Sequence, residues 1–230
     1  MGTEPGWMLS GEDLAAIGLT VKLAAVTTLV LLAIALPLAW WLARTTSRWK
    51  NLIASLVLLP VVLPPTVLGF YLLVFWGNQG WGGMLTRELG WGELPFTFTG
   101  LVVGSVIFSL PFVVQPLHAA FQAIAPHVLE SAATLGAGPI DRFVHVILPQ
   151  SRRGLLSASL LGFMHTVGEF GVVMLLGGNV PGQTEVISTR IYAHVEAMEY
   201  GRAHWLAGMV LLFAFVVLWM LQMLQDQRGP

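Results

Sequence analysis

The sequence contains no cysteine and few charged residues. The first absence excludes disulfide bonds, thiol catalysis and metal sites with cysteine ligands. Charged residues make up 10% of the 230 positions, well below the roughly 25% typical of a soluble domain. Hydrophobic residues make up 56%. Because so few charges cannot cover a water-exposed surface of this size, the composition predicts a protein immersed in lipid. The net charge of −1 does not favour nucleic-acid binding.

Five stretches are apolar and long enough to cross a bilayer as helices. A helix needs about 20 predominantly apolar residues to cross the hydrocarbon core. The expected spans are about 15–43, 52–76, 100–124, 155–177 and 203–225. The sequence therefore predicts one domain over residues 1–230, an all-α polytopic membrane protein with five transmembrane helices.

The loop charges predict the orientation of these spans. Basic residues concentrate in the loops after the first and third spans: Arg44, Arg48, Lys50, Arg142, Arg152 and Arg153. Loops rich in basic residues stay on the cytoplasmic side of a membrane. We therefore expect the N-terminus outside and the C-terminus in the cytoplasm, in the inner (plasma) membrane of a cell, with lipid around the spans.

The chain has no pattern typical of a nucleotide site. Its two lysines are Lys22 and Lys50, and neither lies in the phosphate-binding pattern G-x-x-x-x-G-K-[ST]. The sequence therefore predicts a protein that is not an enzyme and needs no cofactor or metal. Any ATP hydrolysis is expected of a separate polypeptide.

The expected cytoplasmic loop 126–150 contains a short polar helix. "PHVLESAATL" begins with Pro126, and Gly136 and Gly138 end the helix before Pro139 begins the next one. Such a helix, held at both ends by spans, is a surface on which a partner protein could push. A helix resting on the lipid headgroups explains the same residues equally well.

The loop also resembles the EAA loop of bacterial ABC importer permeases. That motif reads Glu-Ala-Ala, three residues, Gly, nine residues, Ile, one residue, Leu-Pro; this chain departs from it only at Ser131 and Val146. The resemblance implies that the short helix docks into a cleft on a cytoplasmic ATPase subunit and transmits its closure to the spans. It assigns the coupling role to Glu130, Ala132, Ala133, Gly136 and Pro149.

Three further stretches are similar to the permeases of molybdate ABC transporters. They are "LPVVLPPTVLGF" (59–70), "SLPFVVQPL" (109–117) and "HTVGEFGVVMLLGGNVPGQTEV" (165–186). "GEFG" also occurs in sulfate permeases, whereas "GGNVPGQT" is closer to the molybdate branch. The resemblance implies a type I importer permease working as a homodimer, with two ATPase subunits and a periplasmic or extracellular molybdate-binding protein. Sulfate or tungstate remain alternative substrates.

Prolines in the second and third spans predict bends that expose polar groups to a central path. A tetrahedral dianion needs hydrogen-bond donors, and the candidates along these spans are Thr66, Ser109 and Gln115. The alternative is that each hydroxyl bonds back to its own helix. In the fourth span, Gly154, Ala158, Gly162 and Thr166 repeat every four residues, which favours close helix packing, either within the subunit or beside the path. The bulky fifth span is expected to face lipid.

Glu169 is the residue of the fourth span that lipid tolerates least. An ionised carboxylate on the path would repel a dianion, so a structural or gating role is favoured over substrate binding. It could pair with Lys22 or Arg190, cap backbone donors, or be protonated. His165 lies four residues earlier on the same face, and we expect a buried hydrogen bond between them rather than a proton relay or metal pair. An intramembrane enzyme using His165 and Glu169 is a distant alternative.

Overall fold

The computed structural model describes residues 9–226, and every regular element in this part of the chain is helical. The expected all-α class is therefore confirmed, while residues 1–8 and 227–230 of the predicted domain lie outside the description. The elements, including one π-helical segment, η1, are α1 (Gly11–Arg44), α2 (Lys50–Val62), α3 (Pro65–Trp76), α4 (Trp81–Glu88), α5 (Phe98–Gln122), α6 (Pro126–Thr134), α7 (Pro139–Arg142), η1 (Phe143–Ile147), α8 (Leu148–Gln150), α9 (Arg152–Gly168), α10 (Gly171–Gly177), α11 (Ile187–Glu196) and α12 (Tyr200–Asp226).

The helices match the five predicted spans, with two of the spans broken. Among the described residues, α1, α5 and α12 are each long and apolar enough to cross a membrane without a break. The pairs α2–α3 and α9–α10 meet the same criterion only together, and they bend by 112° and 60°. Counting each bent pair as one span gives the expected five.

The first helix begins four residues earlier than the predicted span because of a local capping motif. The Ser10 hydroxyl accepts a hydrogen bond from the Asp13 backbone N–H, and the Asp13 carboxylate accepts one from the Ser10 N–H. This reciprocal pair satisfies two donors that a helix N-terminus otherwise leaves free. The helix then continues through Pro37 to Arg44.

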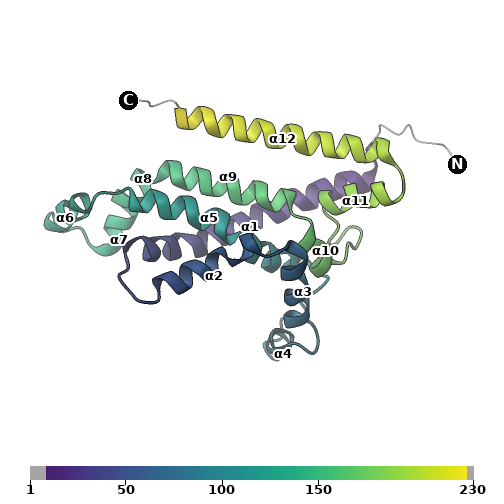
Figure 1. The fold of residues 1–230 in the computed structure, drawn as a ribbon, viewed down its shortest axis with the longest axis horizontal. Helices are drawn as coiled ribbons and strands as arrows, with labels where there is room; N and C mark the ends of the chain where they lie inside the picture. Colours follow the sequence, from purple (N-terminus) through teal and green to yellow (C-terminus); the bar gives the residue numbers. More distant parts are fainter. Residues whose placement is uncertain (1–8, 227–230) are drawn as a thin grey trace.

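Helices α1, α5 and α9 pack side by side and form the centre of the bundle (Figure 1). The stripe of small residues on α9 makes this packing possible. A Cβ atom on Gly154 would lie 2.3 Å from the Ala120 Cβ, and one on Gly162 would lie 2.5 Å from Val113 Cγ2. The stripe therefore serves close contact with α5 inside the subunit, which was one of its two expected roles.

An arginine fastens the end of α1 to the end of α5. The Arg44 guanidinium donates hydrogen bonds to the carbonyl oxygens of Phe121 and Ile124, at 3.1 and 2.8 Å, and stacks over the Trp40 ring. Because the last carbonyls of a helix lack partners within the helix, a cation here stabilises the helix end. The contact positions the start of the segment α6–α8.

Helix α12 runs alongside the bundle (Figure 1). Most of its large apolar side chains are exposed. Leu211 is 71% exposed, and Leu212 and Phe215 are each 62% exposed. A helix that buries so little of its surface against protein requires an apolar environment on its outer side. This agrees with the expectation that the last span faces lipid.

Prolines break the second span but not the third. Leu63 and Pro64 have extended backbones because each precedes a proline, so α2 ends and α3 begins at a new angle. In contrast, α5 is one continuous helix through Pro111 and Pro116. The polar break that we expected in the third span lies instead in the fourth, where Glu169 adopts an extended conformation between α9 and α10.

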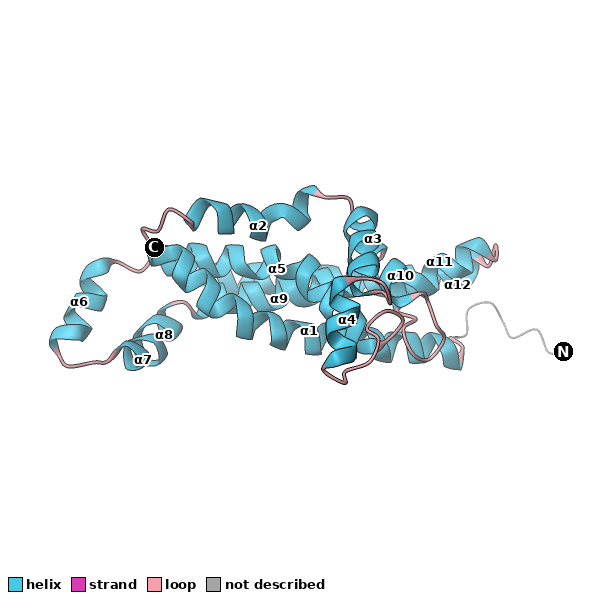
Figure 2. Ribbon diagram, turned by 90° about the horizontal axis from the view of Figure 1, so that it is seen from below, coloured by secondary structure: helices cyan, strands magenta, loops and turns pink. Residues whose placement is uncertain are grey.

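The two broken spans cross each other at glycines. A Cβ on Gly69 of α3 would lie 3.1 Å from the Val172 Cα, and one on Gly171 would lie 2.7 Å from the Pro65 Cβ. The half-helices α3 and α10 therefore approach nearly backbone to backbone. Figure 2 shows this crossing near one end of the bundle, with α6, α7 and α8 projecting from the other.

Candidate functional site

Helices α5 and α9 share a buried row of polar side chains. His165 Nδ1 lies 2.9 Å from Ser109 Oγ, and Ser109 Oγ lies 3.3 Å from Thr166 Oγ1. Two phenylalanines of α5 flank the imidazole: its centroid is 3.8 Å from that of Phe112 and 4.8 Å from that of Phe108. Two phenylalanine rings and the Ser109 hydroxyl, all from α5, therefore hold the imidazole in place.

Glu169 lies at the break between α9 and α10 with its side chain buried. It is 3% exposed, and neither carboxyl oxygen has a hydrogen-bond partner among the described residues. The Ser105 hydroxyl interacts with the carboxyl, although the two atoms do not meet hydrogen-bond geometry. The main-chain oxygen of Glu169 accepts a hydrogen bond from the Ser188 hydroxyl. A hydrogen bond therefore fixes the backbone at the break, whereas none from the described residues fixes the carboxyl group.

The expected partners of Glu169 are occupied elsewhere. Lys22 Nζ lies 4.7 Å above the Phe98 ring, and Arg190 binds the carboxylates near the start of α1. The expected hydrogen bond between His165 and Glu169 is also not formed, because the His165 Nδ1 bonds to Ser109. His165 near the end of α9 and Glu169 at the break after it each lie beside a different serine of α5, Ser109 and Ser105.

The junction of the two breaks forms an open pocket of about 400 Å³. Its wall includes Pro65 and Thr66 from the first turn of α3, Phe108 from α5, and His165, Glu169 and Gly171 from the fourth span. The structure thus brings together two of the predicted path residues, Thr66 and Glu169. A third, Ser109, reaches the pocket only through His165. Gln115 is exposed on α5 and does not line it.

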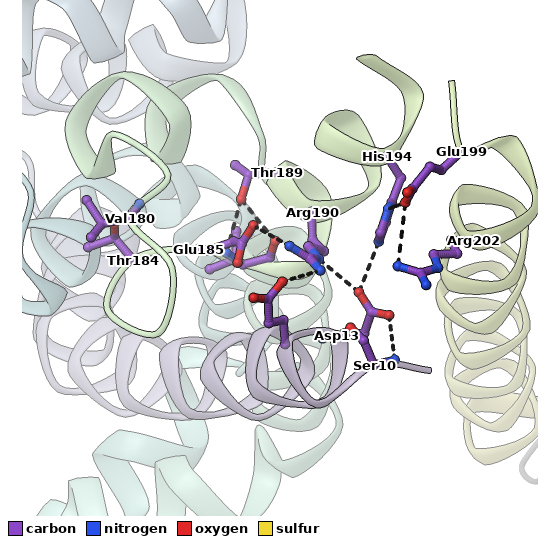
Figure 3. A network of polar contacts seen from close by, with 12 residues as sticks. Ser10, Asp13, Val180, Thr184, Glu185, Thr189, Arg190, His194, Glu199 and Arg202 are labelled. Atoms are coloured by element: carbon purple, nitrogen blue, oxygen red, sulfur yellow. Dashed lines mark hydrogen bonds and ion pairs between the residues drawn. The ribbon is translucent and has the colours of Figure 1, made fainter. Parts of the chain in front are cut away.

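A second polar cluster lies at the end of the bundle near the chain's N-terminus (Figure 3). Arg190 Nε donates to Asp13 Oδ1 at 2.8 Å, and the His194 ring bridges Asp13 Oδ1 and Glu199 Oε2 at 3.0 and 2.8 Å. Arg202 approaches the same Glu199 carboxylate at 3.6 Å. The cluster joins α1, α11 and the start of α12.

Further acids surround the arginine of this cluster. Arg190 also contacts the carboxylates of Glu12, at 2.7 Å, and Glu185, at 3.3 Å. Burial opposes the charge of Arg190, but the hydrogen bonds to Asp13 and Glu12 and the nearby charge of Glu185 raise the pKa of its guanidinium. Sequence reasoning treated this region as an outer loop and missed the cluster. The sequence offered one signal for this cluster: Arg190 is a basic residue in a chain with few charges, and Glu12 and Asp13 are acids near the start of the first span.

The predicted coupling helix is present as α6, and none of its residues is buried. Glu130 and Ala133 are exposed, and Ala132 is half-buried. Gly136 ends the helix with a φ of +87°, a left-handed conformation that side chains with a Cβ rarely adopt. Leu135 is 88% exposed, so the end of the helix offers an apolar side chain without a partner in the described chain.

The chain after α6 returns to the bundle through α7, η1 and α8. Ile140 is 81% exposed and borders an open concavity of about 490 Å³ with Pro139 and Val144. His145 and Asp141 form an exposed ion pair at 2.7 Å. Pro149 is exposed near the end of this segment. The five predicted coupling residues thus lie on one projecting segment (Figure 2).

Comparison with known sequences identifies the family of this fold. The profile of "Binding-protein-dependent transport system inner membrane component" matches residues 35–228. The chain is 60% identical over 213 residues to "Molybdenum transport system permease protein ModB" of Azotobacter vinelandii, covering 93% of this chain and 94% of the relative. It is 34% identical over 200 residues to "Probable sulfate transport system permease protein cysT" of Zygnema circumcarinatum, covering 87% and 68%.

Solved structures show the same fold at low sequence identity. A chain of a bacterial alginate ABC transporter, in complex with an alginate-bound periplasmic protein, matches with a TM-score of 0.76 and 19% identity, covering 96% of this chain and 81% of that one. An amino acid ABC transporter matches with a TM-score of 0.63 and 17% identity, covering 94% of each chain. The protein therefore belongs to the inner membrane components of binding-protein-dependent transport systems.

Proposed function

We propose that this chain is the membrane-spanning subunit of an ATP-driven importer that moves molybdate across the inner membrane by alternating access. The observation that carries this proposal is the 60% identity, over nearly the full length of both chains, to a molybdenum permease. Sulfate permeases at 34% identity keep sulfate as the second candidate substrate. Tungstate, also a tetrahedral dianion, is a third.

The projecting segment α6–α8 is the proposed contact with the ATPase. Its exposed Glu130, Ala133 and Leu135 form a surface that the rest of the described chain does not cover. Arg44 ties the base of the segment to the ends of α1 and α5. A push on α6 would therefore move both central helices. Two permeases, each resting on one ATPase subunit, would make a symmetric transporter in which ATP binding draws the coupling helices together.

The proposed path runs beside the crossing of α3 and α10. Lipid cannot satisfy the backbone groups that the two breaks release, so an irregular backbone at this depth must face protein or water. The crossing glycines let the two half-helices slide or rock with little side-chain interference. Thr66 and Glu169 then lie on the path or its gate. Gln115, which is exposed on α5 outside the pocket, remains a weaker candidate for the path.

The end opposite α6 is the proposed docking site for a soluble molybdate-binding protein. The cluster around Arg190 fixes α11 to α1 there and gives this end a defined shape (Figure 3). Substrate selection at high affinity belongs to the binding protein in this proposal. The permease needs only weak contacts along its path.

Transport by the assembled complex tests the proposal. The permease, its ATPase and its binding protein are reconstituted in vesicles, and uptake of labelled molybdate is followed with and without ATP. We expect ATP-dependent uptake that tungstate reduces and sulfate at equal concentration does not. Equal competition by sulfate would overturn the molybdate assignment. Uptake of neither anion would overturn the proposed function altogether.

A further inference from the structure

The pocket between the two breaks combines features that a simple packing defect does not have. It is open to one side, and the first turn of α3, a helix of 12 residues, contributes Thr66 to its wall. The N-terminus of a helix attracts anions through its free N–H groups and its dipole. Thr66 is exposed, so its hydroxyl is accessible. Glu169 also lines this pocket; its side chain is 3% exposed, and neither carboxyl oxygen has a hydrogen-bond partner in the described part of the chain.

The surroundings of Glu169 determine its charge. In a low-dielectric interior, an ionised carboxylate is stable only with a cation or several hydrogen-bond donors beside it. The described chain provides neither, because Lys22 lies over Phe98 and Arg190 is bound to acids of α1 and of the segment before α11. The neutral, protonated carboxyl is therefore the stable form at this position. Unlike the carboxylate, this form carries a hydrogen-bond donor.

We propose that this pocket is a transient subsite for a tetrahedral oxyanion, in which the protonated Glu169 donates a hydrogen bond to the passing anion. The inference rests on the proposed function, since it requires an oxyanion on this path. It removes the electrostatic objection to an acid beside a dianion, because the repelling charge is absent while Glu169 holds its proton. Ionisation of Glu169 would convert the same group into a barrier.

Two further donors complete the subsite. One is the Thr66 hydroxyl at the start of α3. The other is His165, whose Nε2 has no hydrogen-bond partner among the described residues. When the Ser109 hydroxyl donates to His165 Nδ1, Nε2 carries the ring proton and can donate to an anion. The flanking rings of Phe108 and Phe112 keep the imidazole in place.

Uptake should consequently fall as the pH rises enough to ionise Glu169. The other titratable groups near this site are His165 on α9 itself and Tyr192 of α11, whose ring contacts Phe170. Lys22 of α1 lies over the Phe98 ring and Arg190 of α11 binds Asp13, so neither cation faces Glu169. Because Glu169→Gln keeps both His165 and Tyr192, an alkaline fall that is lost in this variant reports on Glu169.

The test compares wild type, Glu169→Gln and Glu93→Gln in the reconstituted complex with ATPase and binding protein. Glutamine keeps a donor but cannot ionise, and Glu93 is an exposed acid outside the pocket. Molybdate uptake is measured from neutral to alkaline pH and divided by the rate of ATP hydrolysis at each pH. For wild type and Glu93→Gln, we expect a fall of up to about tenfold per pH unit once Glu169 ionises. For Glu169→Gln, we expect a flat profile.

The same alkaline fall in Glu169→Gln would overturn the inference, and so would loss of uptake at every pH in an assembled Glu169→Gln complex. Assembly is checked by co-purification with the ATPase. A second pair of variants is independent of Glu169: at saturating molybdate, Thr66→Val should lower the uptake per ATP hydrolysed several-fold, and Thr66→Ser should restore it. An unchanged uptake per ATP in Thr66→Val would also count against the subsite. Failure of wild-type uptake, by contrast, would refute the proposed function itself.

Discussion

The guanidinium of Arg190 lies 2.8 Å from the carboxylate of Asp13, although the two residues are 177 positions apart. Asp13 is 1% exposed, and among the described residues its only other side-chain partner outside its own turn is His194. The pair closes the bundle by fixing α11 against the first turn of α1. Because Asp13 also caps α1 through Ser10, one carboxylate serves both the local and the long-range structure.

Removal of this arginine should destabilise the protein. Arg190→Gln leaves the buried Asp13 carboxylate without its strongest partner, and breaking a buried pair from one side destabilises by about 3 kcal/mol. We expect a clearly lower temperature of unfolding in detergent, measured by intrinsic tryptophan fluorescence. Arg202→Gln is the matched control, since the ion pair of Arg202 is with the half-exposed Glu199, at 3.6 Å. Equal losses in both variants would show that the Asp13 pair is not the important contact.

Substitution within the small-residue stripe should separate α5 from α9. Gly162→Ala places a Cβ 2.5 Å from Val113 Cγ2, and such overpacking destabilises by roughly 1–3 kcal/mol. Gly208→Ala is the control, because a Cβ at Gly208 on α12 meets no atom within 4 Å. Thermal unfolding of the two purified variants gives the comparison. A Gly162→Ala protein as stable as Gly208→Ala would refute the close packing.

The left-handed turn after α6 should be necessary for coupling to the ATPase. Gly136→Val forces a β-branched side chain into a φ of +87° and should redirect the end of α6. We expect normal amounts of protein in the membrane but at least about tenfold lower ATP-dependent uptake, a loss of about 1.4 kcal/mol or more in coupling free energy. Gly138→Val is the control, since Gly138 has an ordinary φ of −69° and free space around it.

Charge reversal at Glu130 tests the same surface without changing the backbone. Glu130 is exposed, so Glu130→Arg should leave folding unaffected. We expect the variant to reach the membrane but to lose co-purification with the ATPase subunit, measured from solubilised membranes. Asp141→Arg, an exposed acid further along the same projecting segment, serves as the comparison. Normal transport by Glu130→Arg would remove the docking role from this position.

Removal of the Ser109 hydroxyl should lower thermal stability and molybdate uptake more than removal of the Ser159 hydroxyl. Ser109→Ala leaves the half-buried His165 Nδ1 without its partner, which destabilises by about 1 kcal/mol. Ser159 of α9 bonds to the Leu155 carbonyl of its own helix, so Ser159→Ala should have a much smaller effect. Molybdate uptake and thermal stability of both variants are the readouts. Equal behaviour would show that the Ser109–His165 contact is dispensable.

Composition and local patterns were sufficient to predict the membrane class, the all-α fold and the short helix α6. Scarce charge and long apolar runs require lipid, and these properties belong to the sequence alone. Pro126, Gly136 and Pro139 bound α6 through local backbone preferences, which act in any environment. Likewise, Pro64 and Pro65 ended one half of the second span where expected.

Predictions from local backbone preference were wrong where tertiary contacts compete with that preference. Pro111 and Pro116 remain within the continuous helix α5, because packing against α1 and α9 outweighs the backbone bonds that each proline removes. The fourth span breaks at Glu169 without any proline, beside the close crossing of α3 and α10. No pattern along the chain shows where two half-helices will cross.

The sequence by itself determined that this chain is an all-α membrane protein, that it has five apolar stretches long enough to span a bilayer, and that a short helix follows Pro126. Only the tertiary structure decided the partners of the ionisable side chains. Arg190 pairs with Asp13 rather than Glu169, and His165 bonds to Ser109. The physical reason is that charge and hydrogen-bonding capacity are properties of single residues, whereas a partner within 3 Å is set by how distant helices cross.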